Sequence, residues 1–160
     1  ILWIHTSHPI NHRYWPSFGS RNTKLLNQPY KVSCIETVVK HCSKSFNIVL
    51  IDDYSFSKLV KGWEIDMDKL ANPVKAHIRM LALAKLLRDF GGLLLPNSTI
   101  VCKDLKPLYD NALKTSCCFS VNMINRGVTA DLSSMFPTTK ILGCKNQIYF
   151  TKKISFFFFV

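Results

Sequence analysis

Acidic residues are scarce in this sequence: its 160 residues include 10 Asp and Glu against 21 Lys and Arg, a formal net charge of +11. Charged residues of both signs make up only 19% of the chain, whereas hydrophobic residues make up 48%. This balance excludes a disordered tail, a coiled coil and a collagen-like repeat. A continuous apolar run of about 18 residues, the length of a membrane-spanning helix, is also missing. The composition therefore predicts one globular domain with a sizeable core.

Arginine is rare among the basic residues, which comprise 16 Lys and 5 Arg. An excess of positive charge attracts phosphates, acidic glycans and anionic membrane surfaces. Arg, however, is the side chain that binds phosphates and base edges through two parallel hydrogen bonds. Two interpretations therefore stay open: a functional anion-binding surface, and compositional drift in an AT-rich coding sequence.

Paired metal-binding spacings are absent, although the chain has six cysteines and five histidines. The cysteines form no CxxC pair, no histidine has a ligand spacing to them, and the adjacent pair at 117–118 makes a poor bridge. We therefore expect the cysteines to be small buried hydrophobic residues in a reducing, cytoplasm-facing compartment. They are Cys34, Cys42, Cys102, Cys117, Cys118 and Cys144.

An initiator Met is missing, and the sequence has no basic leader with a cleavage site. The chain opens directly in an apolar stretch and ends in five apolar residues, 156–160, so we expect it to be truncated at both ends. We assign residues 1–150 to the folded domain and 151–160 to an apolar tail. Two origins stay open for this tail: the start of a membrane segment flanked by Lys152 and Lys153, and read-through of a frameshifted T-rich stretch.

Apolar patterns typical of strands and of helices alternate along the chain. Residues 6–30 and 61–72 are expected to be loops, and 141–150 fits either a strand or a helix. The alternation predicts an α/β fold with a parallel or mixed sheet, in which 46–51 is a central strand. Strands are expected at 2–5, 46–51, 93–95, 99–102 and 118–123, and helices at 32–41, 54–60, 73–90 and 105–113.

The clearest element is the helix expected at 73–90, which the two glycines that follow it should end. Lys75 and Arg79 share one face of this helix. Lys85 and Asp89 have the i, i+4 spacing of an ion pair.

Residues 81–105 carry a distinctive order of features: an apolar helix, Phe90-Gly91-Gly92, a leucine strand, a polar triplet and a second strand. This order resembles the DXD-containing sugar-binding region of GT-A type glycosyltransferases, including the capsular polysaccharide and mannosyltransferase-like groups. The strand at 2–5, the loop with Trp15 and the segment 46–53 are similar to that family's opening, so the resemblance spans about residues 1–115. It implies a GT-A-like, Rossmann-related mixed sheet with flanking helices, a nucleotide-sugar donor and a glycan or glycoprotein acceptor.

The chain departs from this family where the family places its carboxylates, because Pro96, Asn97 and Ser98 stand at the DXD position. In the family those carboxylates hold a divalent cation that neutralises the departing diphosphate. The family's Asp and Arg on the preceding helix fall on Met80 and Leu83. The resemblance therefore implies two alternatives: a metal site for Mn²⁺ or Mg²⁺ rebuilt from other ligands, or Lys and Arg side chains that hold the diphosphate without a metal.

Polar residues stand beyond the predicted strands, where ligands of open α/β sheets bind. For each of them a structural interpretation stays open beside binding, namely helix capping for the Asp pair after residue 51, a polar turn at 97–98 and a solvated basic loop at 6–30. The substrate-binding candidates are His5, Thr6, Trp15, Asp52, Asp53, Asn97 and Ser98, and the phosphate-binding candidates are Arg13, Arg21 and Lys24.

Two other features fit structural roles better than binding. Asp66 and Asp68 spell a DXD, but they precede the 73–90 helix instead of following the glycine pair, so we expect a solvated loop there. Trp3 lies in a predicted strand and is expected in the core, whereas Trp15 is the better aromatic face for stacking on a sugar or base.

Three functions follow as hypotheses. The first is a glycosyltransferase-like protein that binds a nucleotide sugar and transfers the sugar to a glycan or protein acceptor; its catalytic residues stay unassigned. The second is a degenerate, non-catalytic relative that serves as a carbohydrate-binding or scaffold domain. The third is a basic nucleic-acid-binding module, which the net charge favours but the scattered lysines do not. A membrane partner is expected only through the apolar tail.

Overall fold

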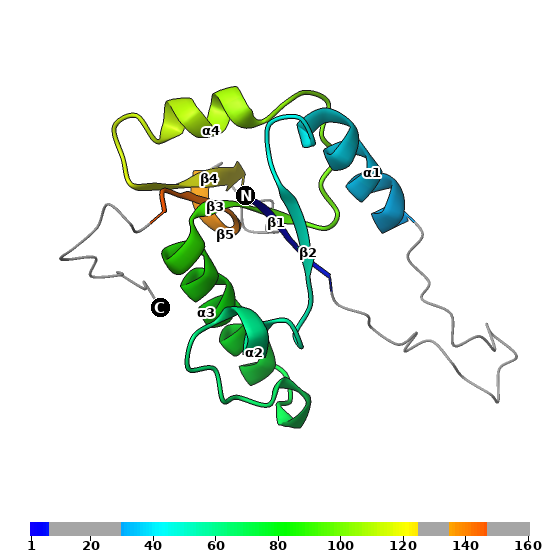
Figure 1. The fold of residues 1–160 in the computed structure, drawn as a ribbon, viewed down its shortest axis with the longest axis vertical. Helices are drawn as coiled ribbons and strands as arrows, with labels where there is room; N and C mark the ends of the chain where they lie inside the picture. The colour runs from blue at the N-terminus through cyan, green and yellow to red at the C-terminus, as the bar shows by residue number, and fades with distance from the viewer. Residues whose placement is uncertain (7–29, 125–134, 147–160) are drawn as a thin grey trace, which may run out of the picture.

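The computed structural model describes residues 1–6, 30–124 and 135–146, which form a mixed sheet with helices on both faces (Figure 1). The α/β class predicted from the sequence is confirmed. The strands are β1 (Leu2–His5), β2 (Ile48–Ile51), β3 (Gly92–Pro96), β4 (Cys118–Ile124) and β5 (Met135–Cys144). The helices are α1 (Tyr30–Cys42), α2 (Phe56–Leu59), α3 (Val74–Phe90) and α4 (Lys106–Ala112), with a 3-10 turn η2 (Met67–Lys69).

The five strands lie in the order β2-β1-β3-β5-β4. β1 pairs in parallel with both β2 and β3, and these three strands form the parallel half of the sheet. β5 runs antiparallel to β3 and to β4, so β5 and β4 form the antiparallel half. As a result, the carboxyl ends of β1, β2 and β3 all lie at one edge.

Two expected strands differ in the structure. The segment at 46–51 enters the sheet only at Ile48 and forms its edge, not its centre, so that Leu50 is 53% exposed. Residues 99–102 form no strand, because a turn follows β3 in which the Thr99 N–H donates to the Pro96 carbonyl at 3.2 Å. Val101 still reaches the core from this irregular segment, which explains its apolar character.

Helix α3 has the predicted extent, and it ends at Gly91, whose φ of +67° is a backbone conformation that favours glycine. The expected pairing of Lys85 with Asp89 is wrong. Asp89 instead pairs with Arg88 at 2.7 Å, and the Lys85 ammonium lies 5.6 Å from the centroid of the Trp63 ring. The cation therefore covers an aromatic face of the core, not a carboxylate.

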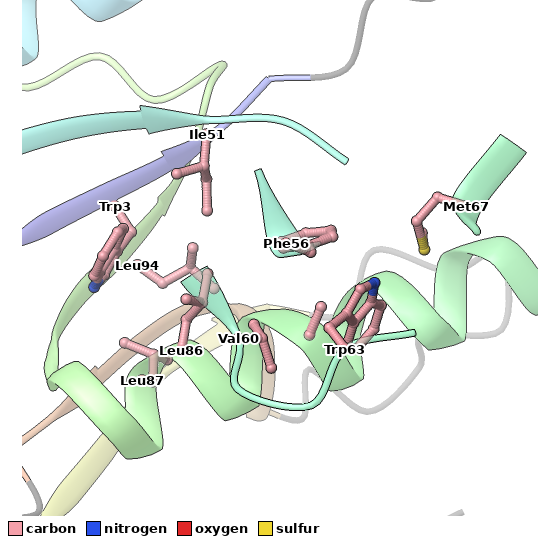
Figure 2. Packing of buried hydrophobic residues seen from close by; sticks show 10 residues of the cluster. Trp3, Ile51, Phe56, Val60, Trp63, Met67, Leu86, Leu87 and Leu94 are labelled. Carbon is pink, nitrogen blue, oxygen red and sulfur yellow. The ribbon is translucent and has the colours of Figure 1, made fainter. Parts of the chain in front are cut away.

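Alternate residues of the strands supply two cores, one on each face of the sheet. The first core packs beneath α2 and α3, where Trp3 and Leu94 meet side chains such as Phe56 and Leu86 (Figure 2). The second core packs against α1 and α4. Its members are Leu2, Ile4, Val38, Cys42, Phe46, Leu93, Leu95 and Val101. Because both faces are covered there, β1 and β3 are almost continuously apolar, with His5 as the exception at the end of β1.

The glycine pair after α3 is a point of close approach between distant segments. The Trp3 indole, only 3% exposed as the sequence predicts, donates to the Gly91 carbonyl at 2.9 Å. A Cβ on Gly92 would lie 2.5 Å from the carbonyl oxygen of Ile1, so a side chain there would push β1 away. The pair thus allows β3 to lie against β1.

The expectation of buried cysteines holds for only two of the six. Cys34 and Cys42 are buried, whereas Cys102 and Cys118 are exposed and the remaining two are half-buried. The apolar α1 face and the second core explain the first two. Among the described helices, none has the length and apolar character needed to cross a membrane.

Candidate functional site

Three neighbouring strands end together, and polar residues follow each of them. His5 in β1 lies opposite Ile51 of β2 and opposite Pro96 of β3, so the residues that come next share one edge of the sheet. We call this group the strand-end edge. It comprises six of the residues that the sequence singles out: His5, Thr6, Asp52, Asp53, Asn97 and Ser98.

Asp53 is the centre of a charged network at this edge. Arg79 binds it through two hydrogen bonds, from Nε to Oδ1 at 2.7 Å and from Nη2 to Oδ2 at 2.5 Å. The His5 Nε2 lies 2.9 Å from Oδ1, and the Lys75 ammonium lies 3.9 Å from Oδ2. The side chain of Asp53 is only 14% exposed. Both of its oxygens are therefore engaged by donors from β1 and α3.

Helix α3 supplies the cations because Lys75 and Arg79 are four residues apart and so lie on one face. The helix runs back along β3, and its first two turns therefore reach the strand-end edge. The sequence shows the shared face of these two residues, but not the carboxylate that they meet. That contact depends on the order of the strands. Because only β1 separates β2 from β3, Asp53, which follows the end of β2, comes within reach of Lys75 and Arg79.

Burial and charge set the protonation of this network. Burial raises the pKa of Asp53, but the hydrogen bonds and charge of Arg79, with those of His5, outweigh it and hold the pKa below its usual value. Burial lowers the pKa of His5 more than the hydrogen bond and charge of Asp53 raise it. At neutral pH His5 is therefore an uncharged imidazole whose Nε2–H donates to the Asp53 carboxylate.

The side chain of Asp52 bonds within the turn that precedes α2. Its Oδ1 accepts from the Ser55 N–H at 2.8 Å and from the Ser55 hydroxyl at 2.6 Å, directly before α2. The Asp52 N–H in turn donates to the Ser55 hydroxyl at 3.2 Å. These bonds close the turn before α2, whose N-cap residue is Ser55 and has no side-chain capping bond. Asp52 therefore has a local role in this turn and does not cap the helix itself, whereas Asp53 faces the sheet edge.

Asn97 and Ser98 lie in the turn that follows β3, as the sequence predicts, with Asn97 half-buried and Ser98 exposed. With Pro96 they offer an amide and a hydroxyl where the resemblance would place two carboxylates. The carboxylate of Asp53, at the same edge, is held by Arg79. Within the described ranges, no group of three His, Cys, Asp or Glu side chains has a metal-binding arrangement. This donor set does not fit a divalent cation.

A pocket of about 140 Å³ adjoins the strand-end edge and shares Asp53 with it. Asp66 and Asp68 line this pocket and are half exposed, at 52% and 57%, which agrees with the solvated loop expected from the sequence. Each carboxylate already has a partner: Lys69 lies 3.3 Å from Asp66, and the Tyr54 hydroxyl donates to Asp68 at 2.8 Å. The pocket therefore offers acceptors for hydroxyl groups without a large excess of negative charge. Its other lining residues are Tyr54, Ser57, Trp63, Ile65 and Met67.

The structure does not place every predicted residue. Trp15 and the phosphate-binding candidates Arg13, Arg21 and Lys24 lie outside the described residues, as does the tail at 151–160. Met80 and Leu83, which stand at the helix positions of the family's Asp and Arg, differ in their surroundings. Met80 is 38% exposed, and Leu83 packs against the first core.

Comparison with protein-family models, curated proteins and solved structures finds no match to this chain. The residues of the strand-end edge and of the adjoining pocket are therefore what a functional proposal rests on.

Proposed function

We propose that this chain is a glycosyltransferase-like domain that binds a nucleotide sugar at the strand-end edge and passes the sugar to a glycan or protein acceptor. The observation that carries the proposal is the gathering of polar side chains behind three parallel strands, His5–Thr6, Asp52–Asp53 and Asn97–Ser98. Open α/β sheets bind their ligands in this position. The helix-glycine-glycine-strand order in the sequence adds the resemblance to sugar-binding regions.

Lys75 is the cation best placed to meet a diphosphate in this proposal. Its ammonium lies 3.9 Å from Asp53 and 3.7 Å from Asp68, and both distances exceed that of a hydrogen bond. A phosphate oxygen can therefore recruit the Lys75 donors without breaking a short contact. Arg79 is different, because its guanidinium makes two short bonds to Asp53 and holds that carboxylate in place.

The pocket beside Asp53 suits the sugar in this proposal. Carboxylates that already have partners accept hydrogen bonds from hydroxyl groups, and the exposed Tyr54 ring offers an apolar face. Because the donor set at Pro96–Ser98 does not fit a divalent cation, no step of the transfer is assigned to a metal.

A non-catalytic relative is the second candidate, and one observation favours it. Arg79 and His5 bond both oxygens of Asp53 and lower its pKa, so the best-placed carboxylate of the edge is a weak base. Such a domain would bind the nucleotide sugar or a glycan and would not transfer it. Binding is therefore common to both candidates, and turnover separates them.

Calorimetric titration of the full chain with UDP-glucose and GDP-mannose tests the proposal, each in the presence of EDTA and of Mn²⁺. We expect one of the two to bind equally well under both conditions. Lys75→Ala, Asn97→Ala and Ser98→Ala should each weaken binding by about tenfold, the loss expected for one hydrogen bond to a charged ligand. Lys114→Ala, which removes an exposed lysine four residues before β4, is the control and should leave affinity unchanged.

The outcomes separate the hypotheses. Release of nucleoside diphosphate on addition of a glycan acceptor supports a transferase, and binding without release supports the non-catalytic relative. A folded sample that binds neither donor overturns the proposal. If the same sample instead binds a single-stranded oligonucleotide with an affinity that falls steeply with salt, the nucleic-acid-binding hypothesis replaces it.

A further inference from the structure

Three thiols gather at the opposite end of the sheet from the strand-end edge. Cys118 at the start of β4 lies directly opposite Cys144 at the end of β5, and Cys117 precedes Cys118. Cys144 also lies opposite Gly92, the residue at which β3 begins. The strand-end edge lies beyond Pro96, at the other end of β3, so the two sites are separate.

The register places the Cys118 and Cys144 side chains close together. The Lys145 N–H donates to the Cys117 carbonyl at 2.9 Å, one position outside the pair. Cys118 and Cys144 are therefore a non-hydrogen-bonded pair, the type in which opposed Cα atoms are only about 4.5 Å apart. This spacing lies within the range of about 4.4–6.8 Å that disulfides span. Directly opposed residues also share a face of the sheet, so the Cys118 and Cys144 side chains extend to the same side.

The two thiols differ in access. Cys118 is exposed on the edge strand of the sheet, whereas Cys144 is half-buried and packs against the first core. The Tyr109 hydroxyl donates to the Cys144 carbonyl at 2.7 Å and fixes the backbone there. A dissolved reagent therefore meets Cys118 first, with Cys144 held behind it.

We propose that Cys118 and Cys144 are a modification site, at which exchange with a low-molecular-weight disulfide forms a cross-strand bridge. The Cys118 thiolate attacks one sulfur of the small disulfide, whose S–S bond breaks, and one half leaves as a thiolate that takes a proton. The Cys144 thiolate then attacks the Cys118 sulfur and displaces the second half, which also takes a proton. Two protein thiols are oxidised, and the small disulfide is reduced to two thiols. This proposal does not depend on nucleotide-sugar binding.

The surroundings of the thiols indicate how the exchange should depend on pH. Burial raises the pKa of Cys144 to about 12, and burial, with the neighbouring Cys117, also raises the pKa of Cys118. Only a small fraction of either thiol is a thiolate at neutral pH, so the bridge should form faster as pH rises. A sulfur with a high pKa is also a poor leaving group, so the finished bridge should resist reduction.

Intact mass and peptide mapping of the folded full chain test this proposal after incubation with oxidised glutathione at about pH 8 and alkylation of the remaining thiols. We expect the unmodified sequence to lose two thiols and to yield one linked pair, Cys118 with Cys144. Cys144→Ser should stop at a glutathione mixed disulfide on Cys118. Cys117→Ser should retain the bridge, and Cys102→Ser is a control for an exposed thiol outside the cluster.

Any other product at the three clustered thiols of the unmodified chain overturns the proposal. Such products are a link between Cys117 and Cys118, a link from Cys117 to Cys144, and glutathione retained on Cys118 without a bridge. Unreacted thiols in the folded protein, at a pH where free glutathione exchanges, overturn it as well. Because the decisive measurement uses the native sequence, the result stands even if a serine variant fails to fold.

Discussion

The parallel and antiparallel halves of the sheet carry different chemistry at opposite ends of β3. In the parallel half, three strands stop together, and the network of Asp53, Arg79 and His5 lies beyond them. In the antiparallel half, a pair of cysteines lies across the strands, where Cys118 faces Cys144. The residues of the strand-end edge come together because three strands end at the same place. Cys118 and Cys144 come together because the strand register sets them opposite each other.

This difference determines which sequence signals reveal each site. Polar residues directly after an apolar run indicate the end of a buried strand, and Asp52, Asp53, Asn97 and Ser98 all have that signature. A cross-strand pair has no such signature, because the spacing between two opposed residues depends on the length of the connection. Cys118 and Cys144 therefore show no motif in the sequence even though they lie directly opposite each other in the sheet.

Removal of Arg79 should have the largest effect, because it leaves a mostly buried carboxylate in the parallel half without its main partner. We expect Arg79→Ala to lower the free energy of unfolding by about 2 kcal/mol, less than a fully buried ion pair would lose, since His5 and Lys75 still contact Asp53. Urea denaturation measures the loss.

The control for this variant is Arg88→Ala, which removes the partner of Asp89 from an exposed pair on the same helix. Its cost should stay below about 0.5 kcal/mol. Adding Asp53→Asn to Arg79→Ala should recover part of the lost stability, because the unpaired charge is then gone. Equal effects of the two arginine variants would show that Asp53 is solvated in solution.

A methyl group at Gly143 should have the next largest effect, and it acts on the antiparallel half. The Phe119 ring lies over this glycine, and a Cβ there would overlap its edge. The Phe119 ring must then shift and lose its contact with the Tyr109 ring, the two ring centroids being 6.2 Å apart. We expect Gly143→Ala to cost about 1–2 kcal/mol, in the lower part of the range for overpacking.

A double-mutant cycle with Phe119→Leu sharpens this prediction. Gly143→Ala should cost less stability when residue 119 is leucine than when it is phenylalanine. Thermal unfolding of the unmodified chain, the two single variants and the double variant measures the coupling. If the two changes are simply additive, contact between ring and glycine is not what the alanine disrupts.

The pH dependence of stability gives the smallest expected effect and probes His5. Its folded-state pKa is lowered, chiefly by burial, so the protein releases this proton on folding. The contribution of His5 to stability is therefore full above about pH 6.5 and is lost as the pH falls through the folded-state pKa. Asp53, whose pKa is also lowered despite burial, adds a further loss below about pH 4.

His5→Gln keeps a donor for Asp53 and removes the titration. The free energy of unfolding of this variant should change less between about pH 7 and pH 5 than that of the unmodified chain. His41→Gln, at the end of α1, is the matched histidine control and should leave the slope in place. An unchanged slope in His5→Gln would show that this residue does not titrate differently in the folded state.

Much of the fold follows from local patterns, and the failures have physical causes. Helix α3 combines a long apolar face with terminating glycines, β1 and β3 are compact apolar runs, and β4 alternates apolar with polar residues, so the sequence predicts all four. The strand β5 carries Pro137 and Lys140 and receives its pairing from β3 and β4, so its start at Met135 has no periodic signal. Residues 99–102 are apolar because Val101 fills the core from a loop.

The candidate site is predictable to a similar degree. The positions after strands are visible in the sequence, whereas the partners of Asp53 depend on sheet order. The pocket loop with Asp66 and Asp68 comes to Asp53 through the packing of Trp63 and Met67 in the first core and through long-range contacts of Tyr54 and Lys75 with Asp68. Packing between residues that are distant in the sequence produces no recognisable spacing of residue types along the chain.

The position of β1 between β2 and β3 also has a consequence for how the chain folds. Its Trp3 bonds to a carbonyl 88 residues further along, so the centre of the sheet cannot form by zipping adjacent segments together. During synthesis the apolar strand Leu2–His5 has no pairing strand until β2, and later β3, have left the ribosome. In that interval it is open to association with other nascent chains. The period of vulnerability is thus set by the length of chain between β1 and the glycine pair, not by the strength of any single contact.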